Sequence, residues 1–475
     1  MRRLLYAVPL FLLFSTSALA QEPAAPPAGS VSRAADGAPV CGLGAEFHAG
    51  RRVALRESLK EGVLVLRGLP PSRGNLTFRQ DKNFWWLTGV ESPNVAFAMD
   101  IESGHEVLFV YKPSAWKERW EGEIWDSDDA WVAELTGIED VRPTADLLDV
   151  VEEMLGLDTS GEAPRRLWTN LGAHIGLAGS YDSAGPYDRA RAKDPLDGRI
   201  SREKAFAAHL EERFGREVHD CWKAMSQIRV VKTAEEIAAM ERAARSGALA
   251  MCEAMRSCRP GLGEWDLDAL LNWIQARHGA DGPAYAAIVG SGANSLVLHY
   301  NFSARRMRDG EVVLIDFGPE VDHYTTDITR TFPVNGKFTD RQAEIYDVVL
   351  AAQAAGIAAA RPGSTIADVE LACRDVILEA GMQKFMRHGA VHSVGMEVHD
   401  PGSMRGELVP GMCFTIEPGL YEDATGIGVR IEDVVVITAE GCRVISDQAP
   451  KERSEIEALM AEKGVLDWVD GRSNR

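Results

Sequence analysis

The stretch VVLIDFGPEVDHYTTDITRTF, residues 312–332, places two acids where a buried strand is expected. Four apolar residues typical of such a strand come first, and Asp316 follows directly on them. Asp327 comes eleven residues later, among threonines and an isoleucine that favour strands. A buried carboxylate is costly unless a partner compensates its charge. We therefore expect a specific partner for these two acids.

The same pattern returns about a hundred residues later in the chain. FTIEPGLY, residues 414–421, sets Glu417 in an apolar strand-like run, and GVRIEDVVVIT, residues 428–438, does the same with Glu432. Taken singly, each acid would be interpreted as a salt-bridged strand residue. If the strands face one another, four carboxylates converge, and they cannot all stay ionised at that separation without a cation.

The segments around these acids predict that residues 233–450 form two halves with the same order of elements, helices first and strands after. A capping box formed by Thr233 and Glu236 begins the first pair of helices, and strands follow through residue 332. A second box, Thr339 with Gln342, begins another pair of helices, and strands are expected from about residue 391 to residue 445. Such a duplication lets two curved sheets face each other with helices outside.

One histidine segment completes the candidate ligands. HGAVHSVGMEVHD, residues 388–400, carries His388, His392 and His399. The spacing of the first two resembles H-E-x-x-H, but no glutamate follows His388 and the glycines disfavour a helix, so the zincin pattern is excluded. One imidazole among four carboxylates suits two divalent ions of the manganese, cobalt or zinc kind.

The rest of the chain predicts an exported, two-domain protein. Residues 1–20 have two arginines, an apolar run and Ala-Leu-Ala, which is the layout of a cleaved secretory signal; a membrane anchor is the alternative, but the run is short for one. The Ala-, Pro- and Gly-rich residues 21–44 are typical of a flexible tether. Residues 45–220 have a mixed α/β pattern, and residues 221–475 form the part with two halves. We expect a periplasmic or secreted protein.

The composition of the chain disfavours two classes of binding partner. The formal charge of −20 argues against nucleic acid or an anionic membrane, and 45% hydrophobic with 26% charged residues is ordinary for a globular protein. The length of 475 residues suggests two domains. Seven cysteines are an odd number, so at least one lacks an intramolecular partner in an oxidised protein, and most are expected to be buried apolar residues.

These motifs resemble the pita-bread metallopeptidases, and the aminopeptidase P and prolidase branch is the most similar. The resemblance is carried by VLIDFG, TTDITRTF, TIEPGLY and GVRIEDVV, and in the amino-terminal half by RRVALRESL and FRQDKNFWWLTGV. It implies an α+β fold with a pseudo-twofold catalytic domain preceded by a creatinase-type α/β domain. It also implies a homodimer or homotetramer.

The resemblance implies a role for each matching residue. The ligands of two metal ions would be Asp316, Asp327, His392, Glu417 and Glu432. Glu417 would also carry a proton to the leaving nitrogen, while His399 would bind the oxyanion and His299 would help hold the substrate. His388 and Arg430 would line the pocket for the proline ring and product carboxylate.

Plain alternatives exist for two of these residues, and the chain departs from the family at two others. His299 could be a core histidine, and Arg430 could be an outward-facing charge. Ser393 replaces the usual glycine or tryptophan after the ligand histidine, and Arg387 replaces a smaller or apolar residue. Both departures are expected to affect pocket shape.

The sequence thus predicts a manganese-dependent Xaa-Pro aminopeptidase that acts on short proline-containing peptides, with cobalt or zinc as alternative metals. The first alternative is a prolidase restricted to dipeptides. A catalytically silent peptide-binding protein of the same fold is another, but such a protein should have lost metal acids, and all are present. A serine hydrolase is disfavoured because no G-x-S-x-G motif occurs.

Overall fold

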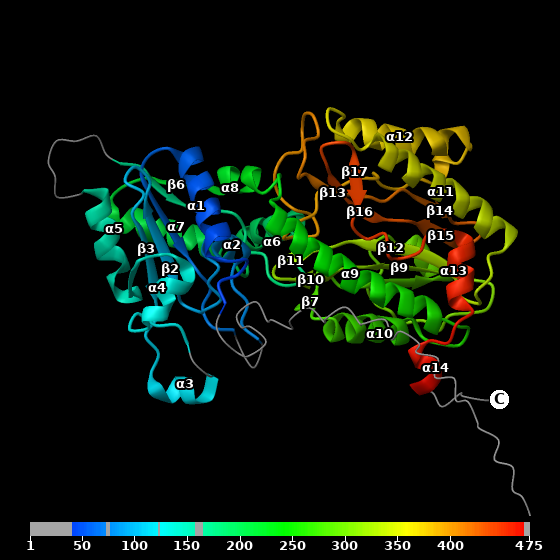
Figure 1. The fold of residues 1–475 in the computed structure, drawn as a ribbon, viewed down its shortest axis with the longest axis horizontal. Helices are drawn as coiled ribbons and strands as arrows, with labels where there is room; N and C mark the ends of the chain where they lie inside the picture. Colours follow the sequence, from blue (N-terminus) through cyan, green and yellow to red (C-terminus); the bar gives the residue numbers. More distant parts are fainter. Residues whose placement is uncertain (1–39, 73–76, 122–123, 157–164, 470–475) are drawn as a thin grey trace, which may run out of the picture.

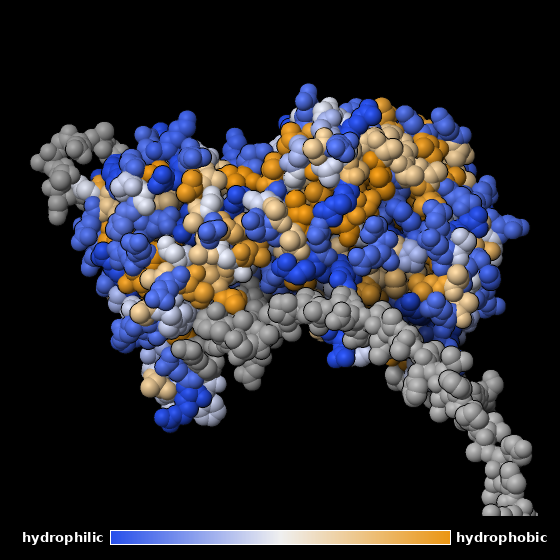
Figure 2. All heavy atoms as spheres, in the orientation of Figure 1, coloured by the Kyte–Doolittle hydropathy of each residue, from blue (hydrophilic) through white to orange (hydrophobic). Residues whose placement is uncertain are grey.

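The computed structural model describes residues 40–72, 77–121, 124–156 and 165–469. The chain forms two parts that lie side by side, an amino-terminal part around one sheet and a larger carboxy-terminal part (Figure 1). Figure 2 shows hydrophilic residues over both parts on this face, with apolar residues between them. The predicted leader and most of the predicted tether lie outside the described residues.

The amino-terminal part is a mixed sheet of six strands in the order β4-β3-β2-β1-β5-β6. Strands β1, β2 and β3 are antiparallel neighbours, and the outer pairs are parallel. The strands are β1 (Val63–Arg67), β2 (Ala96–Asp100), β3 (Glu106–Val110), β4 (Asp140–Pro143), β5 (Leu167–Thr169) and β6 (Val218–Asp220). The helices are α1 (Ala45–Leu59), α2 (Lys82–Thr88), α3 (Ala115–Glu121), α4 (Ala130–Thr136), α5 (Leu147–Leu155), α6 (Tyr181–Lys193) and α7 (Arg202–Phe214), with the 3-10 turn η1 (Thr144–Asp146).

Helices cover both faces of this sheet, so the central strands are apolar on both sides. Val63 and Val65 pack in the core formed with α5 and α7, whereas Leu64 and Leu66 pack in the core formed with α1 and α2. Successive side chains of a strand point to opposite faces, which explains this division. A turn at residues 101–103 leads from β2 toward β3.

The carboxy-terminal part repeats a plan of helices followed by strands. A short helix, α8 (Trp222–Ile228), precedes it. The first half has α9 (Ala234–Ser257), α10 (Glu264–Arg277), β7 (Gly282–Pro283), β8 (Ile288–Ser291), η2 (Gly292–Leu296), β9 (Val312–Phe317), β10 (Pro319–Val321), β11 (Tyr324–Thr325) and β12 (Ile328–Pro333). The second has α11 (Asp340–Ala359), α12 (Ile366–Glu379), η3 (Gln383–Phe385), β13 (Cys413–Ile416), β14 (Gly419–Glu422), β15 (Ile427–Arg430), β16 (Asp433–Ile437) and β17 (Cys442–Val444), followed by α13 (Arg453–Met460) and α14 (Val465–Val469).

The helices of this part lie outside its strands (Figure 1). Both predicted capping boxes are confirmed: Thr233 with Glu236 begins α9, and Thr339 with Gln342 begins α11. The two halves meet where the backbone of Glu432 pairs with Thr329 of β12, with a hydrogen bond of 3.0 Å from the Glu432 amide to the Thr329 carbonyl. The strands that carry the candidate acids are therefore brought together at the centre.

One strand prediction is wrong: residues 391–412 form no strand. In this segment polar side chains satisfy backbone groups that a ladder would otherwise pair. The Glu397 amide donates to Asp400 Oδ1 at 3.2 Å, and the Ser393 hydroxyl donates to the Asp400 carbonyl. Apolar composition alone did not reveal this local competition.

The cysteines and the helices give two further observations. All seven cysteines are free thiols, five of them buried, which agrees with their expected role as small apolar residues. Among the helices of the described ranges, none combines the length and the apolar character needed to cross a bilayer.

Candidate metal centre and active site

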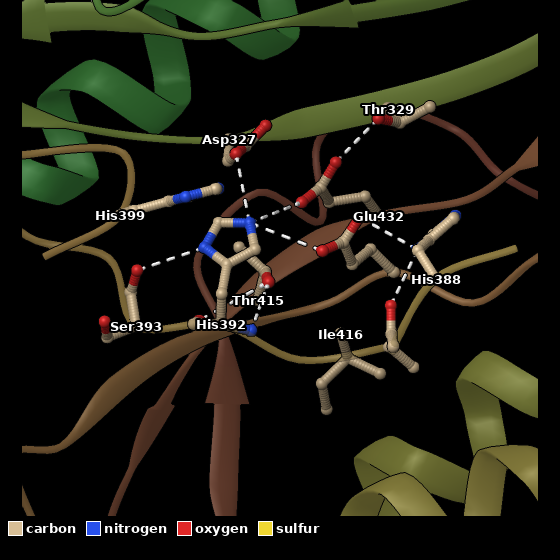
Figure 3. Close-up of polar contacts among 12 residues, drawn as sticks. Asp327, Thr329, His388, His392, Ser393, His399, Thr415, Ile416 and Glu432 are labelled. Atoms are coloured by element: carbon tan, nitrogen blue, oxygen red, sulfur yellow. Dashed lines mark hydrogen bonds and ion pairs between the residues drawn. The ribbon is translucent and has the colours of Figure 1, made fainter. Parts of the chain in front are cut away.

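Four carboxylates gather around one imidazole, as the sequence predicts. Figure 3 shows two of them, Asp327 and Glu432, beside His392. His392 Nε2 lies 3.4 Å from Glu417 Oε1, 3.6 Å from Asp327 Oδ2 and 3.7 Å from Glu432 Oε1. Asp316 joins the group through the Tyr285 hydroxyl, which contacts Asp316 Oδ1 at 2.5 Å and also contacts Asp327 Oδ1. We call Asp316, Asp327, Glu417 and Glu432 the acid cluster.

The acids stand mostly at strand ends rather than inside strands, which corrects the expectation. Asp316 lies within β9, opposite Ile288 and Thr329. Asp327 directly precedes β12, Glu417 directly follows β13, and Glu432 lies between β15 and β16. At a break in a ladder the backbone can turn a side chain toward a site that a regular pleat would not reach. The sequence pattern gave the strand but not the break.

His392 is oriented by a hydrogen bond of one ring nitrogen and by its backbone. Its Nδ1 donates to the Ser393 carbonyl at 3.0 Å, so Nε2 is the nitrogen that faces the acids. Its backbone is tied to β13 by a bond of 2.9 Å from the Thr415 amide to the His392 carbonyl. This arrangement fixes the tautomer that leaves an electron pair on Nε2, as is usual for a metal-ligating histidine.

The acid cluster is buried and short of positive charge. Asp327 is 4% exposed and Glu432 is 1% exposed. Burial, and then the charges of Glu432 and Asp316, raise the pKa of Asp327 well above its usual value. Burial and the charge of Glu432 raise the pKa of Glu417 to about 8. Burial alone would lower the pKa of His392, but the nearby carboxylates of Glu432 and Glu417 outweigh it and raise that pKa to about 9.

These residues fit a divalent metal ion. One ligand atom each from Asp327, His392 and Glu432 lies within 4.8 Å of the others. Glu432 Oε2 accepts a bond of 2.6 Å from the Thr329 hydroxyl, whereas the buried Oε1 has no hydrogen-bond partner. A buried oxygen without a donor costs stability unless a cation binds it. Carboxylates with one imidazole form a donor set suited to manganese, cobalt or zinc.

Arg430 is buried among the acids, so the outward-facing alternative is wrong. It is 3% exposed, and its Nη2 contacts Asp316 Oδ2 at 2.5 Å. Its Nη1 donates to the Tyr421 hydroxyl at 2.8 Å, and its Nε donates to the Thr329 hydroxyl at 3.2 Å. All three nitrogens of the guanidinium are thus engaged within the protein.

The remaining predicted histidines all border one cavity. His388 Nε2 contacts the Tyr421 hydroxyl at 2.7 Å, and its Nδ1 donates to the Gly389 carbonyl at 2.6 Å. Burial and the charge of Arg430 lower the pKa of His388. His299 is exposed on its turn, so it is not a core histidine. The His399 ring lies 4.2 Å from the His392 ring, centroid to centroid, and its Nδ1 contacts Asp182 Oδ2 at 2.6 Å.

The cavity has a volume of about 600 Å³ and draws its walls from both parts of the chain. Ala178, Ser180, Asp182 and Ser183 come from the amino-terminal part, and the candidate ligands come from the other. Apolar side chains that include Ile288, Val391 and Val398 complete the wall. Neither Ser393 nor Arg387 belongs to the described lining, and Arg387 instead pairs with Asp423 at 2.7 Å.

Sequence reasoning missed four residues of this site: Asp182, Tyr285, Thr329 and Tyr421. Tyr285 is half-buried, and burial followed by the charges of Asp316 and Asp327 raises its pKa well above the usual value. Nothing in the local pattern distinguishes it from a core tyrosine. Thr329 lies in the opening stretch, but only the bond to Glu432 reveals its use.

Comparison with known proteins places these features in a family. Metallopeptidase family M24 matches residues 238–439, and the aminopeptidase P amino-terminal domain matches residues 48–161. The chain is 33% identical to the Xaa-Pro aminopeptidase of Escherichia coli over 450 residues, which cover 86% of this chain and 96% of that protein. The chain belongs to the aminopeptidase P family of metallopeptidases. It is a metallo-exopeptidase, and the predicted family is confirmed.

Further relatives support the assignment of this chain to the aminopeptidase P family. Human Xaa-Pro aminopeptidase 3 is 30% identical over 422 residues, which cover 81% of this chain and 77% of that protein. The structure of E. coli aminopeptidase P with the inhibitor Pro-Leu superposes with a TM-score of 0.71 at 30% identity, covering 90% of this chain and 99% of that one. An aminopeptidase from Pseudomonas aeruginosa gives a TM-score of 0.72 at 31% identity, with coverages of 88% and 98%. These matches confirm the α+β pita-bread fold.

Proposed function

We propose that this protein is a dinuclear Xaa-Pro aminopeptidase, which removes the residue that precedes proline at the amino terminus of a short peptide. The observation that carries the proposal is the excess of buried negative charge. Four carboxylates share one arginine and one imidazole at the edge of a large cavity. Two divalent ions, manganese by preference, would supply the missing positive charge.

Asp316, Asp327, His392, Glu417 and Glu432 would hold these ions. When bound, divalent ions acidify water and polarise a carbonyl oxygen. Tyr285 and Thr329 orient three of these carboxylates through their hydroxyl groups. Because these hydroxyl groups already hold the acids, the geometry is set before a substrate enters.

Glu417 would carry the proton in the proposed hydrolysis. It lines the cavity, where its carboxylate can take a proton from water and release it to the leaving nitrogen. Burial and the charge of Arg430 lower the pKa of His388, which favours its neutral form, and its Nε2 contacts the Tyr421 hydroxyl at 2.7 Å. His299 and His399 border the same cavity from opposite segments of the chain, which places them to bind the reacting peptide.

Arg430 favours an aminopeptidase over a prolidase. An enzyme restricted to dipeptides must recognise the carboxylate of its proline residue, and a free cation is the usual means. Among the described residues that line the cavity, Arg430 is the sole arginine or lysine, and its three nitrogens are occupied. A peptide that continues beyond proline carries no carboxylate at that point, so it needs no such partner.

The choice of proline has a chemical reason. The X–Pro bond lacks an amide hydrogen, so a peptidase that binds substrates through that hydrogen handles the bond poorly. The apolar side chains of the cavity wall offer surface to the pyrrolidine ring. The Xaa-Pro aminopeptidases among the relatives support the same substrate class.

We further propose that the protein is exported to the periplasm or secreted, with cleavage before Gln21, and that it self-associates as a dimer or tetramer. The leader-like composition of residues 1–20 supports export. Mass spectrometry of the protein recovered from an exporting host should give Gln21 as the first residue, whereas an intact leader would contradict the proposal.

The activity is tested with the purified full chain and Mn²⁺ on three matched substrates. We expect release of X from a tripeptide X-Pro-Y, slower release from the dipeptide X-Pro, and little from X-Ala-Y. Cleavage of the dipeptide alone would establish a prolidase instead. A metal content far below two ions per chain, together with no hydrolysis, would point to the silent peptide-binding alternative.

A further inference from the structure

A carboxylate from the amino-terminal part reaches into the active site. Asp182 lies in the first turn of α6, and its Oδ2 is 2.6 Å from Nδ1 of His399, which is 217 residues away in the sequence. Both side chains line the cavity. The Asp182–His399 pair therefore joins the two parts of the chain inside the site.

The position of Asp182 is built by its neighbours. The Ser180 hydroxyl donates to Asp182 Oδ1, so one carboxylate oxygen is held by Ser180 and the other by His399. Tyr181 stacks on Trp222 at 5.0 Å between ring centroids, which fixes the start of α6 against the segment that links the two parts. No residue of α6 is buried, so this end of the helix depends on those few contacts.

The contact selects the orientation of His399. When Nδ1–H donates to Asp182, the ring cannot rotate about its χ angles without losing that bond, and Nε2 is the nitrogen left for the substrate. His399 lies beside His392 on the Asp327 side of the centre (Figure 3). A carboxylate that fixes a histidine ring in this way raises the efficiency of the histidine without touching the reacting atoms.

We propose that Asp182 is a positioning residue for the peptidase reaction, and that it acts through the ring of His399. The proposal rests on the proposed function of the site. A purely structural role is a poor explanation of the pair, because the Asp182 side chain is 55% exposed and the His399 side chain is 35% exposed. Ion pairs at such exposure contribute little to stability. The amino-terminal part would thus complete the active site rather than only cover it.

The test compares Asp182→Ala, Asp182→Asn, His399→Ala and the double variant Asp182→Ala/His399→Ala in the full chain with Mn²⁺. The matched control is Asp188→Ala, which removes another carboxylate of α6 whose partner is Arg191 at 3.2 Å. We expect Asp182→Ala to lower kcat by about 10- to 100-fold, the usual effect of losing such an orienting partner, with KM nearly unchanged. Asp182→Asn should recover part of kcat, because its amide oxygen still accepts from Nδ1–H.

The double variant shows whether the effect passes through His399. Asp182→Ala should cause no further loss of kcat in the His399→Ala background, and the melting temperature should be the same in all variants. Equal losses in both backgrounds, an effect on KM alone, or activity equal to that of Asp188→Ala would each overturn the proposal.

A spectroscopic measurement keeps this test separate from the proposed function. The Nδ1–H proton of His399 should give a low-field NMR signal that is absent in His399→Ala and in Asp182→Ala but present in Asp188→Ala. If the wild-type protein shows this signal and cleaves no X-Pro-Y peptide, the proposed function fails while the pairing stands. If Asp182→Ala retains the signal, the pairing itself is wrong.

Discussion

Two clusters of buried charge lie in the carboxy-terminal part, and they are compensated differently. The first, which we call the Arg229 cluster, consists of Arg229, Lys232, Glu397 and Asp400. Each of its side chains is at most 3% exposed. Arg229 contacts Asp400 at 2.5 Å and Glu397 at 3.1 Å, and Lys232 contacts Asp400 at 3.1 Å. The acid cluster has four carboxylates and one arginine.

The Arg229 cluster has two cations for two carboxylates, so its charges balance within the protein, although Arg229 Nε and Glu397 Oε2 have no hydrogen-bond partner. Arg229 also donates to the Asn83 side chain at 2.8 Å, which ties the histidine-bearing segment to α2 of the amino-terminal part. In the acid cluster the charges do not balance, because four carboxylates share one arginine and one imidazole. The difference in charge compensation therefore distinguishes a structural ion network from a site that needs an added cation.

The largest expected effect is on catalysis, through the uncompensated cluster. Asp327→Asn should lower kcat/KM by more than about 100-fold, the upper end of what outer-shell partners cost, because it removes a proposed ligand. The metal content should fall in elemental analysis, and the metal-free variant should be at least as stable as the metal-free wild type. Asp347→Asn, on the exposed face of α11, is the matched control. Unchanged turnover in Asp327→Asn would refute the proposed site.

The next effect concerns the compensated cluster. Arg229→Ala leaves Asp400 and Glu397 buried with too little positive charge, so we expect a loss of about 3–5 kcal/mol in the free energy of unfolding. Urea denaturation of the metal-free protein measures it. If Arg229→Ala lowers the free energy of unfolding less than Asp327→Asn does, the proposed difference between the two clusters is wrong.

The pH dependence of stability should follow the acid cluster. The pKa of Glu417 is raised to about 8 in the folded chain, so the folded state holds a proton that the unfolded state loses above its ordinary carboxylate pKa. The raised pKa of His392, about 9, acts in the same direction at higher pH. The metal-free protein should therefore lose stability as pH rises from about 4.5 to 9. The lower limit is the ordinary pKa of the Glu417 carboxyl, and the upper limit is the raised pKa of His392.

Melting temperatures measured with EDTA and with Mn²⁺ across that pH range check this. Mn²⁺ should raise the melting temperature more at pH 9 than at pH 5, because it replaces the lost protons. If the melting temperature of the metal-free protein rises with pH through this window, the pKa values of Glu417 and His392 are not raised in the folded state.

Tyr285→Phe should have a smaller effect. It removes the hydroxyl that contacts Asp316 and Asp327 but leaves all proposed ligands, so we expect a loss of about 10- to 100-fold in metal affinity or turnover. Titration of the metal-free variant with Mn²⁺ measures the affinity. Tyr346→Phe is a control on a buried tyrosine of α11, whose hydroxyl donates to the Lys451 carbonyl away from the site.

The smallest effect is expected at an exposed ion pair. Arg453 contacts Asp347 at 2.6 Å, but the side chains are 36% and 52% exposed. Arg453→Ala should change the free energy of unfolding by about 0–1 kcal/mol in urea denaturation. A loss as large as that of Arg229→Ala would show that burial does not set the size of these effects.

Local features of the fold could be predicted from the sequence, whereas features that depend on packing could not. The boxes at Thr233 and Thr339 were predictable because a cap involves residues three positions apart. The absence of strands in residues 391–412 was not, because Glu397 and Asp400 are held there by Arg229, far away in the sequence. The same applies to Tyr285 and Asp182 in the site.

The sequence by itself determined which residue types the site contains and their order along the chain. Asp316 in an apolar strand, followed along the chain by Asp327, His392, Glu417 and Glu432, already predicted a cation, since buried charges need compensation. Only the tertiary structure decided that Arg430 pairs with Asp316, that Tyr285 contacts two of the acids, and that Asp182 holds His399. Those contacts join segments from different elements, and chain packing rather than any local pattern sets the distances between them.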